Sequence, residues 1–117
     1  MNELQCIARL KINDGMLTEY KRLAALCAES VRTKDTGTLQ YETYFNAEET
    51  ECLVFERYRD SQALMEHHHN LGDLYDALLA TCSGSGEVCG NPSAELVEML
   101  NGSPVGVYKP FVPNGSR

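Results

Sequence analysis

All three histidines in this 117-residue chain are consecutive, at His67, His68 and His69. They follow an alternating apolar segment, Cys52 to Tyr58, which is typical of a β-strand. The next residues have helical spacing; at about 100° per residue, His67 and His68 flank the apolar stripe and His69 points away. Because imidazole accepts a proton or binds a metal near neutral pH, any chemistry is expected at this junction of strand and helix.

A run of three histidines resembles a metal site, but its geometry is unfavourable. Consecutive helical side chains diverge by about 100°, so the three imidazoles cannot converge on one ion. Glu66, His69 and Asp73 lie closer together on the polar face, where such groupings are usually adventitious. We therefore expect no metal site in this chain.

The composition excludes several classes of partner. With 17 acidic and 10 basic residues, the net charge of −7 repels nucleic-acid phosphates and anionic membranes. No apolar run approaches the ~18 residues of a membrane span, and the N-terminus lacks a secretion signal, so we expect a soluble, cytoplasmic protein. The five cysteines form no C-x-x-C pair, which favours free thiols in a reducing compartment.

Hydrophobic periodicity predicts alternating strands and helices. Asp14 is placed to cap the first helix, and either Asp60 or Ser61 caps the helix of the histidines. The predicted elements are a strand from Gln5 to Ile12, a helix from about Met16 to Arg32, a strand from Thr38 to Asn46, a hairpin loop from Ala47 to Thr50, a strand ending at Tyr58, a helix to about Thr81, a turn from Ser83 to Gly86, a weak strand from Glu87 to Gly90, a short helix capped by Ser93 and stopped by Gly102, and an extended tail from Val105 to Val112.

Asn70 and Gly72 predict a break or kink in the histidine helix, and Pro110 restricts the tail strand to a sheet edge or a neighbouring subunit. The order of elements is that of a ferredoxin-like α+β fold, an antiparallel sheet with helices on one face, in one domain over residues 1–117. Apolar or aromatic residues stand on both faces of the second and third strands. We therefore expect a homodimer in which a second sheet covers the open face.

Three segments resemble the antibiotic biosynthesis monooxygenase family of dimeric α+β barrels, over roughly residues 4–90. They are Ala8-Arg-Leu-Lys-Ile-Asn-Asp-Gly15, Gly37-Thr-Leu-Gln-Tyr-Glu-Thr-Tyr44 and Phe55-Glu-Arg-Tyr-Arg-Asp-Ser-Gln-Ala-Leu-Met-Glu-His67. The resemblance implies two subunits that join their sheets into a barrel, with a pocket in each subunit between sheet and helices; residues 91–117 add a short helix and an edge or exchanged strand. Members include cofactor-independent oxygenases of anthrones and quinols, relatives that degrade haem, and proteins that act on small signalling compounds.

Departures from the family pattern narrow the choice. Haem-degrading relatives have an asparagine before the arginine of the first strand, a tryptophan in the second helix and an iron-ligating histidine ten residues later. Those positions correspond here to Ala8, His67 and Ala77, so haem degradation is not expected unless His67 or His68 ligates iron instead. Tyr58 stands where many members have tryptophan, whereas His67 matches a histidine that quinol and anthrone oxygenase relatives often have.

The resemblance therefore implies a cofactor-independent monooxygenase that oxidises a small aromatic, such as a quinol or a polyketide phenol or anthrone. Such an enzyme needs a base of near-neutral pKa in a dry, flat, apolar pocket, because the substrate must lose a proton before it can pass an electron to dioxygen. His67 is the first candidate for that base and His68 the second. The predicted site comprises the catalytic residues His67, His68 and Tyr58, and the substrate-binding residues Tyr41, Tyr44, Glu56, Arg57 and Leu71.

Strand parity prevents these side chains from all facing one pocket. We favour the face that carries Glu56 and Tyr58, and the choice between Tyr41 and Tyr44 stays open. One alternative is a non-catalytic protein that binds a small ligand or acts as a dimeric interaction module. Another is isomerase or decarboxylase chemistry in the same pocket. An inward-pointing His67 beside a cavity favours an enzyme, and a pocket filled by Leu71, Tyr75 and Phe55 favours a structural role.

Overall fold

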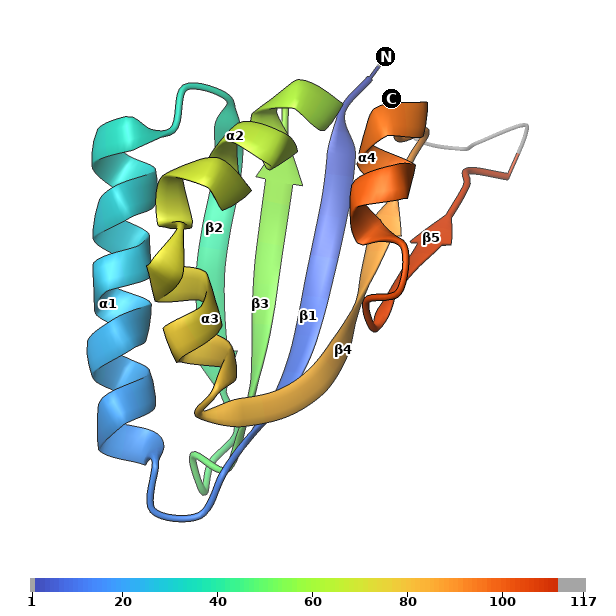
Figure 1. Ribbon diagram of the computed structural model, residues 1–117. Helices are drawn as coiled ribbons and strands as arrows, with labels where there is room; N and C mark the ends of the chain where they lie inside the picture. Colours follow the sequence, from blue (N-terminus) through green and yellow to red (C-terminus); the bar gives the residue numbers. More distant parts are fainter. Residues whose placement is uncertain (1, 112–117) are drawn as a thin grey trace.

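The computed structural model describes residues 2–111 (Figure 1). Within that range no helix is long and apolar enough to cross a membrane. In chain order the elements are β1 (Leu4–Ile12), α1 (Leu17–Lys34), β2 (Thr38–Phe45), β3 (Glu51–Tyr58), α2 (Ser61–Leu71), α3 (Asp73–Leu79), β4 (Cys82–Cys89), α4 (Ala94–Leu100) and β5 (Val105–Tyr108).

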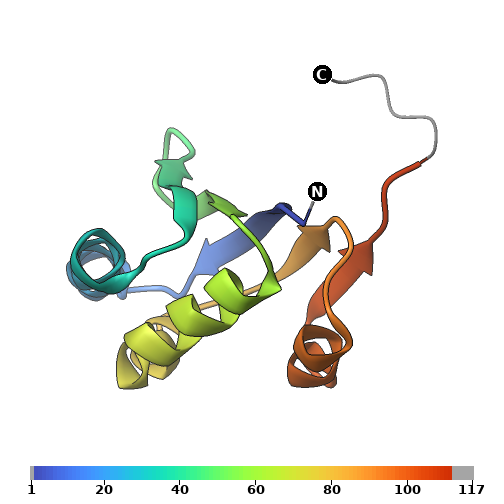
Figure 2. The same ribbon diagram turned by 90° about the horizontal axis from the view of Figure 1, so that it is seen from above.

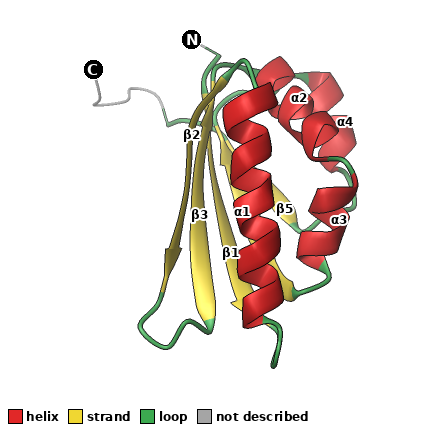
Figure 3. Ribbon diagram, turned by 90° about the vertical axis from the view of Figure 1, so that its left-hand side faces the viewer, coloured by secondary structure: helices red, strands yellow, loops and turns green. Residues whose placement is uncertain are grey.

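The strands form one sheet in the order β2-β3-β1-β4-β5, in which β5 runs parallel to β4 and the other neighbours are antiparallel. All four helices of the described chain lie on one face of this sheet, and the other face is open (Figures 2 and 3). The predicted ferredoxin-like α+β fold is confirmed. β5 lies at the edge of the sheet, one of the two places predicted for the tail strand, but it ends at Tyr108 and so does not contain Pro110; Val112 lies outside the described residues.

Several helix ends follow the predicted chemistry. Asp60 caps α2 by accepting a hydrogen bond from the Ala63 amide at 2.9 Å. Gly72, with φ of 52°, separates α2 from α3 at the predicted break. The prediction for Asp14 was wrong, because α1 begins after Met16 without a side-chain cap.

The predicted turn from Ser83 to Gly86 was also wrong, because these residues are part of β4. Glycine is needed there for close approach. A Cβ on Gly84 would lie 1.9 Å from the carbonyl oxygen of Arg9, on the neighbouring strand β1. A Ser-Gly-Ser-Gly segment is typical of a turn, but here its glycines allow the backbones of β4 and β1 to pack closely.

The space between sheet and helices holds two separate apolar clusters rather than one. Along β3, Cys52 and Val54 belong to one cluster and Tyr58 to the other, and Glu56 lies between them. α2 is divided at the same level, with Ala63 and Leu64 in one cluster, Leu71 in the other, and His67 between them. The fold therefore places two polar side chains, Glu56 and His67, between the two apolar clusters of the core.

Gly84→Ala should destabilise the fold by about 2–3 kcal/mol, because the added methyl group meets a backbone carbonyl that cannot move without disturbing the ladder of β1 and β4. The free energy of unfolding in urea measures the effect. Ser85→Ala, an exposed neighbour on the same strand, is the matched control and should stay within about 0.5 kcal/mol of wild type. Equal stabilities for the two variants would contradict this account of β4.

Candidate functional site

His67 is held by a buried carboxylate. Its imidazole Nδ1 lies 2.8 Å from Oδ2 of Asp35, and the two side chains are 3% and 1% exposed. Asp35 is the residue that ends α1, so the pair joins the end of α1 to the middle of α2. The same carboxylate accepts hydrogen bonds from Thr38 Oγ1 at 2.7 Å and from Asn70 Nδ2 at 2.9 Å.

These hydrogen bonds determine the charge of Asp35. Burial alone would raise its pKa, but the hydrogen bonds from Asn70, Thr38 and His67 outweigh burial and hold the pKa below its ordinary value. Asp35 is therefore an ionised acceptor at neutral pH. A neutral His67 then carries its proton on Nδ1, which assigns Nε2 as the nitrogen that can accept a proton.

The turn that carries Asp35 is fixed against α2 by further contacts. Glu66 accepts hydrogen bonds from the Thr36 amide at 2.9 Å and from the Thr36 hydroxyl at 3.0 Å. Gly37 packs so closely on α2 that a Cβ there would lie 2.6 Å from the Cβ of Ala63. Contacts of Thr36 and Gly37 with α2 thus help to fix the position of Asp35 relative to His67.

Aromatic rings surround the imidazole of His67. The ring centroids of Tyr41 and Tyr58 each lie 5.3 Å from that of His67, and His68 lies 5.7 Å from it. His68 in turn contacts Tyr75 edge to face, with 4.6 Å between centroids. Burial, with a smaller contribution from His67, lowers the pKa of His68 to about 4, so His68 is neutral at pH 7.

Glu56 and Tyr58 form a second polar pair beneath His67. The Tyr58 hydroxyl donates a hydrogen bond to Oε1 of Glu56. Burial raises the pKa of Glu56, and the hydrogen bond from Tyr58 and the proximity of His67 only partly offset that rise. Tyr58 itself is fully buried, and burial followed by the neighbouring Glu56 raises the pKa of its hydroxyl strongly.

A groove of about 290 Å³ runs between α1 and β2 and reaches this cluster through Tyr41. Tyr41 lines the groove and also contacts the ring of His67. Small side chains of α1 form the opposite wall. The lining residues are Lys21, Ala24, Ala25, Ala28, Tyr41, Thr43 and Phe45.

Two of the predicted residues lie on the opposite face of the sheet. Tyr44 is 54% exposed there and packs against Phe55, with 5.7 Å between centroids. Arg57 pairs with Glu3 at 2.8 Å on the same face. Because alternate residues of a strand face opposite sides, neither side chain joins His67, and of the two candidates Tyr41 and Tyr44 only Tyr41 does.

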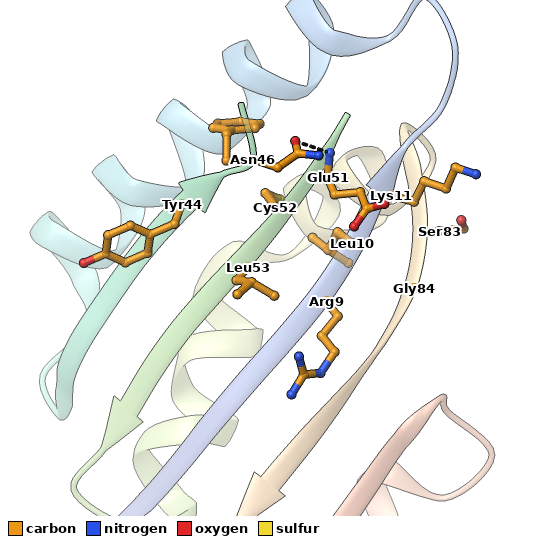
Figure 4. Close-up of a pocket in the computed structure, with 11 residues that line it drawn as sticks. Arg9, Leu10, Lys11, Tyr44, Asn46, Glu51, Cys52, Leu53, Ser83 and Gly84 are labelled. Atoms are coloured by element: carbon orange, nitrogen blue, oxygen red, sulfur yellow. Dashed lines mark hydrogen bonds between the residues drawn. The ribbon is translucent and has the colours of Figure 1, made fainter. Parts of the chain in front are cut away.

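The open face has a hollow of its own, of about 550 Å³, at the end of the sheet near the hairpin of β2 and β3 (Figure 4). Tyr44 is the only predicted site residue among those that line it, and the hollow contains no imidazole. Its charged side chains come from Arg9, Lys11 and Glu51, and Arg9 already pairs with Glu87 at 3.4 Å. The sheet separates this hollow from His67 and Glu56, which lie on the helix side.

The structure therefore brings together six of the predicted residues on the helix side of the sheet. These are His67, His68, Tyr58, Tyr41, Glu56 and Leu71, of which Leu71 packs in the apolar core. Tyr75 also belongs to this side, whereas Phe55 lies on the open face and cannot fill the site. His69 is exposed, and within residues 2–111 no three His, Cys, Asp or Glu side chains are placed to hold a metal ion.

Sequence reasoning missed Asp35, Thr38 and Asn70. The spacing of His67 and Asn70, three residues apart on one helix face, could have identified Asn70 as a neighbour. No local pattern identifies Asp35. It lies in a polar segment typical of a loop, 32 residues before its partner His67.

The fold and site define a ferredoxin-like α+β domain with an acid-imidazole pair between sheet and helices. The sequence pattern described as antibiotic biosynthesis monooxygenase matches residues 4–77, and the chain belongs to this family. No protein of curated function matches the chain.

Solved structures show the same fold at low sequence identity. MupZ from Pseudomonas fluorescens is 23% identical, with a TM-score of 0.79 over 100% of this chain and 96% of that one, so α4 and β5 fall within the match. Rv0793 from Mycobacterium tuberculosis is 21% identical, with a TM-score of 0.68 over 79% and 97% of the two chains. SnoaB from Streptomyces nogalater, a cofactor-independent oxygenase, is 13% identical, with a TM-score of 0.64 over 80% and 97%.

The buried, neutral His68 predicts a loss of stability on mild acidification. Its folded-state pKa of about 4 lies below the ordinary histidine pKa of about 6.5, so between these values the unfolded chain binds more protons and stability falls as pH falls. From pH 7 to pH 5 the loss due to His68 should be about 1–2 kcal/mol. His68→Phe, which keeps an aromatic ring beside Tyr75 but cannot titrate, should lose correspondingly less in urea unfolding at the two pH values. Equal losses in both proteins would contradict this role for His68.

Proposed function

We propose that this protein is a cofactor-independent monooxygenase that oxidises a small aromatic, of the quinol or polyketide phenol and anthrone type, with dioxygen. The observation that carries the proposal is the buried His67, whose Nδ1 is bound to the ionised Asp35. Membership of the antibiotic biosynthesis monooxygenase family supports it, as does the similar fold of a cofactor-independent oxygenase, SnoaB.

In the proposed reaction, His67 removes a proton from the substrate. Nε2 accepts the proton, and the resulting imidazolium is stabilised by the Asp35 carboxylate on the other nitrogen. The electron-rich substrate anion passes an electron to dioxygen, and the two recombine as a peroxide at the substrate carbon. When that carbon is a CH₂ activated by a neighbouring phenol, the proton taken from the substrate returns to the peroxide to give a hydroperoxide. The hydroperoxide then eliminates water, made from its distal OH and the remaining hydrogen of the carbon, and leaves a carbonyl, so one oxygen atom enters the product and the other leaves as water.

The surroundings of His67 favour an uncharged, planar substrate. The rings of Tyr41, Tyr58 and His68 offer flat apolar surfaces and hydroxyl groups, and none of them carries a positive charge at neutral pH. The ionised Asp35 lies directly behind the imidazole and repels an anionic ligand. A neutral phenol that ionises only after binding fits both conditions.

A second candidate function is non-catalytic binding of a small ligand. The nearly complete burial of His67 and Tyr58 favours it, since a ligand confined to the groove between α1 and β2 would contact Tyr41 and not the imidazole.

Oxygen uptake with a panel of substituted hydroquinones and hydroxyanthrones tests the oxygenase proposal. Wild type should consume oxygen with at least one compound, and His67→Ala should be slower by roughly 10²–10⁴-fold because the base is lost. Asp35→Asn should also slow the reaction, since it removes the carboxylate that sets the tautomer of His67. His69→Ala, exposed on the same helix, is the matched control and should keep the wild-type rate.

No uptake by wild type with any compound would refute the oxygenase proposal. Equal rates for wild type and His67→Ala would remove His67 as the base.

We also propose that the protein is a homodimer whose subunits meet through the open faces of their sheets. Leu53 and Phe55 of β3, together with Tyr44 of β2 and Ile7 of β1, give this face apolar side chains that no helix covers (Figure 3). Burying such a patch against a second copy removes apolar surface from water. The family resemblance to dimeric α+β barrels supports the same arrangement.

Phe55→Glu should shift the protein toward the monomer, because it removes an aromatic ring from the open face and places a second carboxylate opposite Glu42, and two neighbouring like charges are costly to bury against a second copy. Light scattering coupled to size-exclusion chromatography measures the mass, which should be twice that of the chain for wild type. Leu26→Glu, a change at an exposed leucine of α1 on the helix layer, is the matched control and should remain dimeric. A monomeric wild type would refute the dimer, and a dimeric Phe55→Glu variant would refute this interface.

A further inference from the structure

Glu56 places a carboxyl group at a helix-facing position of β3, where an apolar side chain is expected. Among the helix-facing positions of the antiparallel strands β1 to β4, it is the only carboxyl. Its neighbours along β3 on that face are Val54 and Tyr58, and across the sheet it pairs with Cys6 of β1 and Tyr41 of β2. Burying a carboxyl between two apolar clusters costs free energy that a hydrophobic residue would not, so packing does not explain Glu56.

Glu56 and His67 occupy the same small region from opposite sides. Tyr41 stands opposite Glu56 in the sheet register, and the Tyr58 hydroxyl is hydrogen-bonded to Glu56 Oε1. Both tyrosine rings also lie 5.3 Å from the ring of His67. The carboxyl from the sheet and the imidazole from α2 therefore share the same two aromatic neighbours. Since Tyr58 bonds to Oε1, Oε2 is left for another partner, and Glu56 is half-buried as a residue.

We propose that Glu56 is the proton donor of the reaction for which His67 is the base. This inference rests on the proposed oxygenase function. In the step assigned to Glu56, the O–O bond of the substrate hydroperoxide breaks while the carbon loses its remaining hydrogen as a proton. The electron pair of the C–H bond forms the new C=O bond, the distal oxygen leaves with the O–O electron pair as hydroxide, and the carboxyl proton converts it to water. The proton lost from carbon returns the donor to its starting state, so the step needs no other reactant.

The protonation states fit this division of roles. Burial raises the pKa of Glu56, whereas the hydrogen bonds around Asp35 outweigh burial and lower the pKa of that carboxyl. Burial thus favours the protonated, proton-donating form of Glu56, whereas the hydrogen bonds favour the ionised form of Asp35 that supports the imidazole; opposite shifts of this kind are common where acid and base act in one site. The titratable groups that face Glu56 are Tyr58 on its own strand, Cys6 on β1, Tyr41 on β2, His67 on α2 and Tyr75 on α3.

Glu56→Gln separates the donor role from a structural one, since glutamine has the same shape and still accepts the hydrogen bond from Tyr58. The experiment is a two-stage stopped-flow measurement with a dihydroxyanthrone or hydroquinone that wild type oxidises. Anaerobic mixing measures ionisation of the bound substrate by absorbance, and a second mix with oxygen measures product formation. Acid quench and mass spectrometry detect hydroperoxide.

Glu56→Gln should ionise the substrate at a rate within about 2-fold of wild type and then form product roughly 10²-fold more slowly, with hydroperoxide accumulating. Glu56→Asp should recover part of the second rate, because it restores a titratable carboxyl. His67→Ala should show the opposite pattern, with the anaerobic ionisation lost. Glu98→Gln, at an exposed position of α4, is the matched control and should resemble wild type in both stages.

Product formation by Glu56→Gln at the wild-type rate, without hydroperoxide, would overturn the donor role and leave the oxygenase proposal intact. A Glu56→Gln variant that fails already at anaerobic ionisation would also overturn it, because the defect would then lie in the site as a whole. Absence of oxidation by wild type would overturn both proposals together.

Discussion

A buried Asp35 carboxylate that accepts hydrogen bonds from three side chains holds the centre of this protein together. Burying an ionised carboxylate without hydrogen-bond partners would cost several kcal/mol, so the folded chain must place hydrogen-bond donors around it. Thr38 comes from the start of β2, whereas His67 and Asn70 come from one face of α2, so a single group ties the α1–β2 turn to the second helix. The orientation of the His67 imidazole, and hence which nitrogen can accept a proton, follows from that tie.

The same interaction explains why the core is divided. α2 must present His67 toward the carboxylate, so it cannot present an apolar side chain at that level, and the apolar packing is interrupted between Leu64 and Leu71. β3 is interrupted at the matching level by Glu56. Hydrophobic residues at both positions would join the clusters into one core at lower cost. Such a departure from simple packing, repeated on two elements that face each other, is the pattern expected where function is retained at the expense of stability.

Sequence reasoning reached the fold because the strands alternate strongly and Gly72 stands where helical spacing breaks. It placed His67, Tyr58 and Glu56 together because strand parity and helical spacing are local properties. It could not find Asp35, whose role depends on a partner 32 residues away and on a turn whose residues look like any polar loop. It misread Ser83 to Gly86 for a related reason, since the need for glycine there comes from the backbone of another strand.

The two faces of the sheet carry different kinds of side chain. The open face carries apolar side chains suited to a second copy, whereas the titratable groups gather on the helix face, where Tyr41 separates His67 from the groove between α1 and β2. In the proposed reaction the substrate anion must react with dioxygen and not with solvent protons, which requires a site closed to water, and the near-complete burial of His67 meets that requirement. In the proposed reaction, a planar substrate that enters from the groove first meets Tyr41, whose ring lines the groove and lies beside the ring of His67.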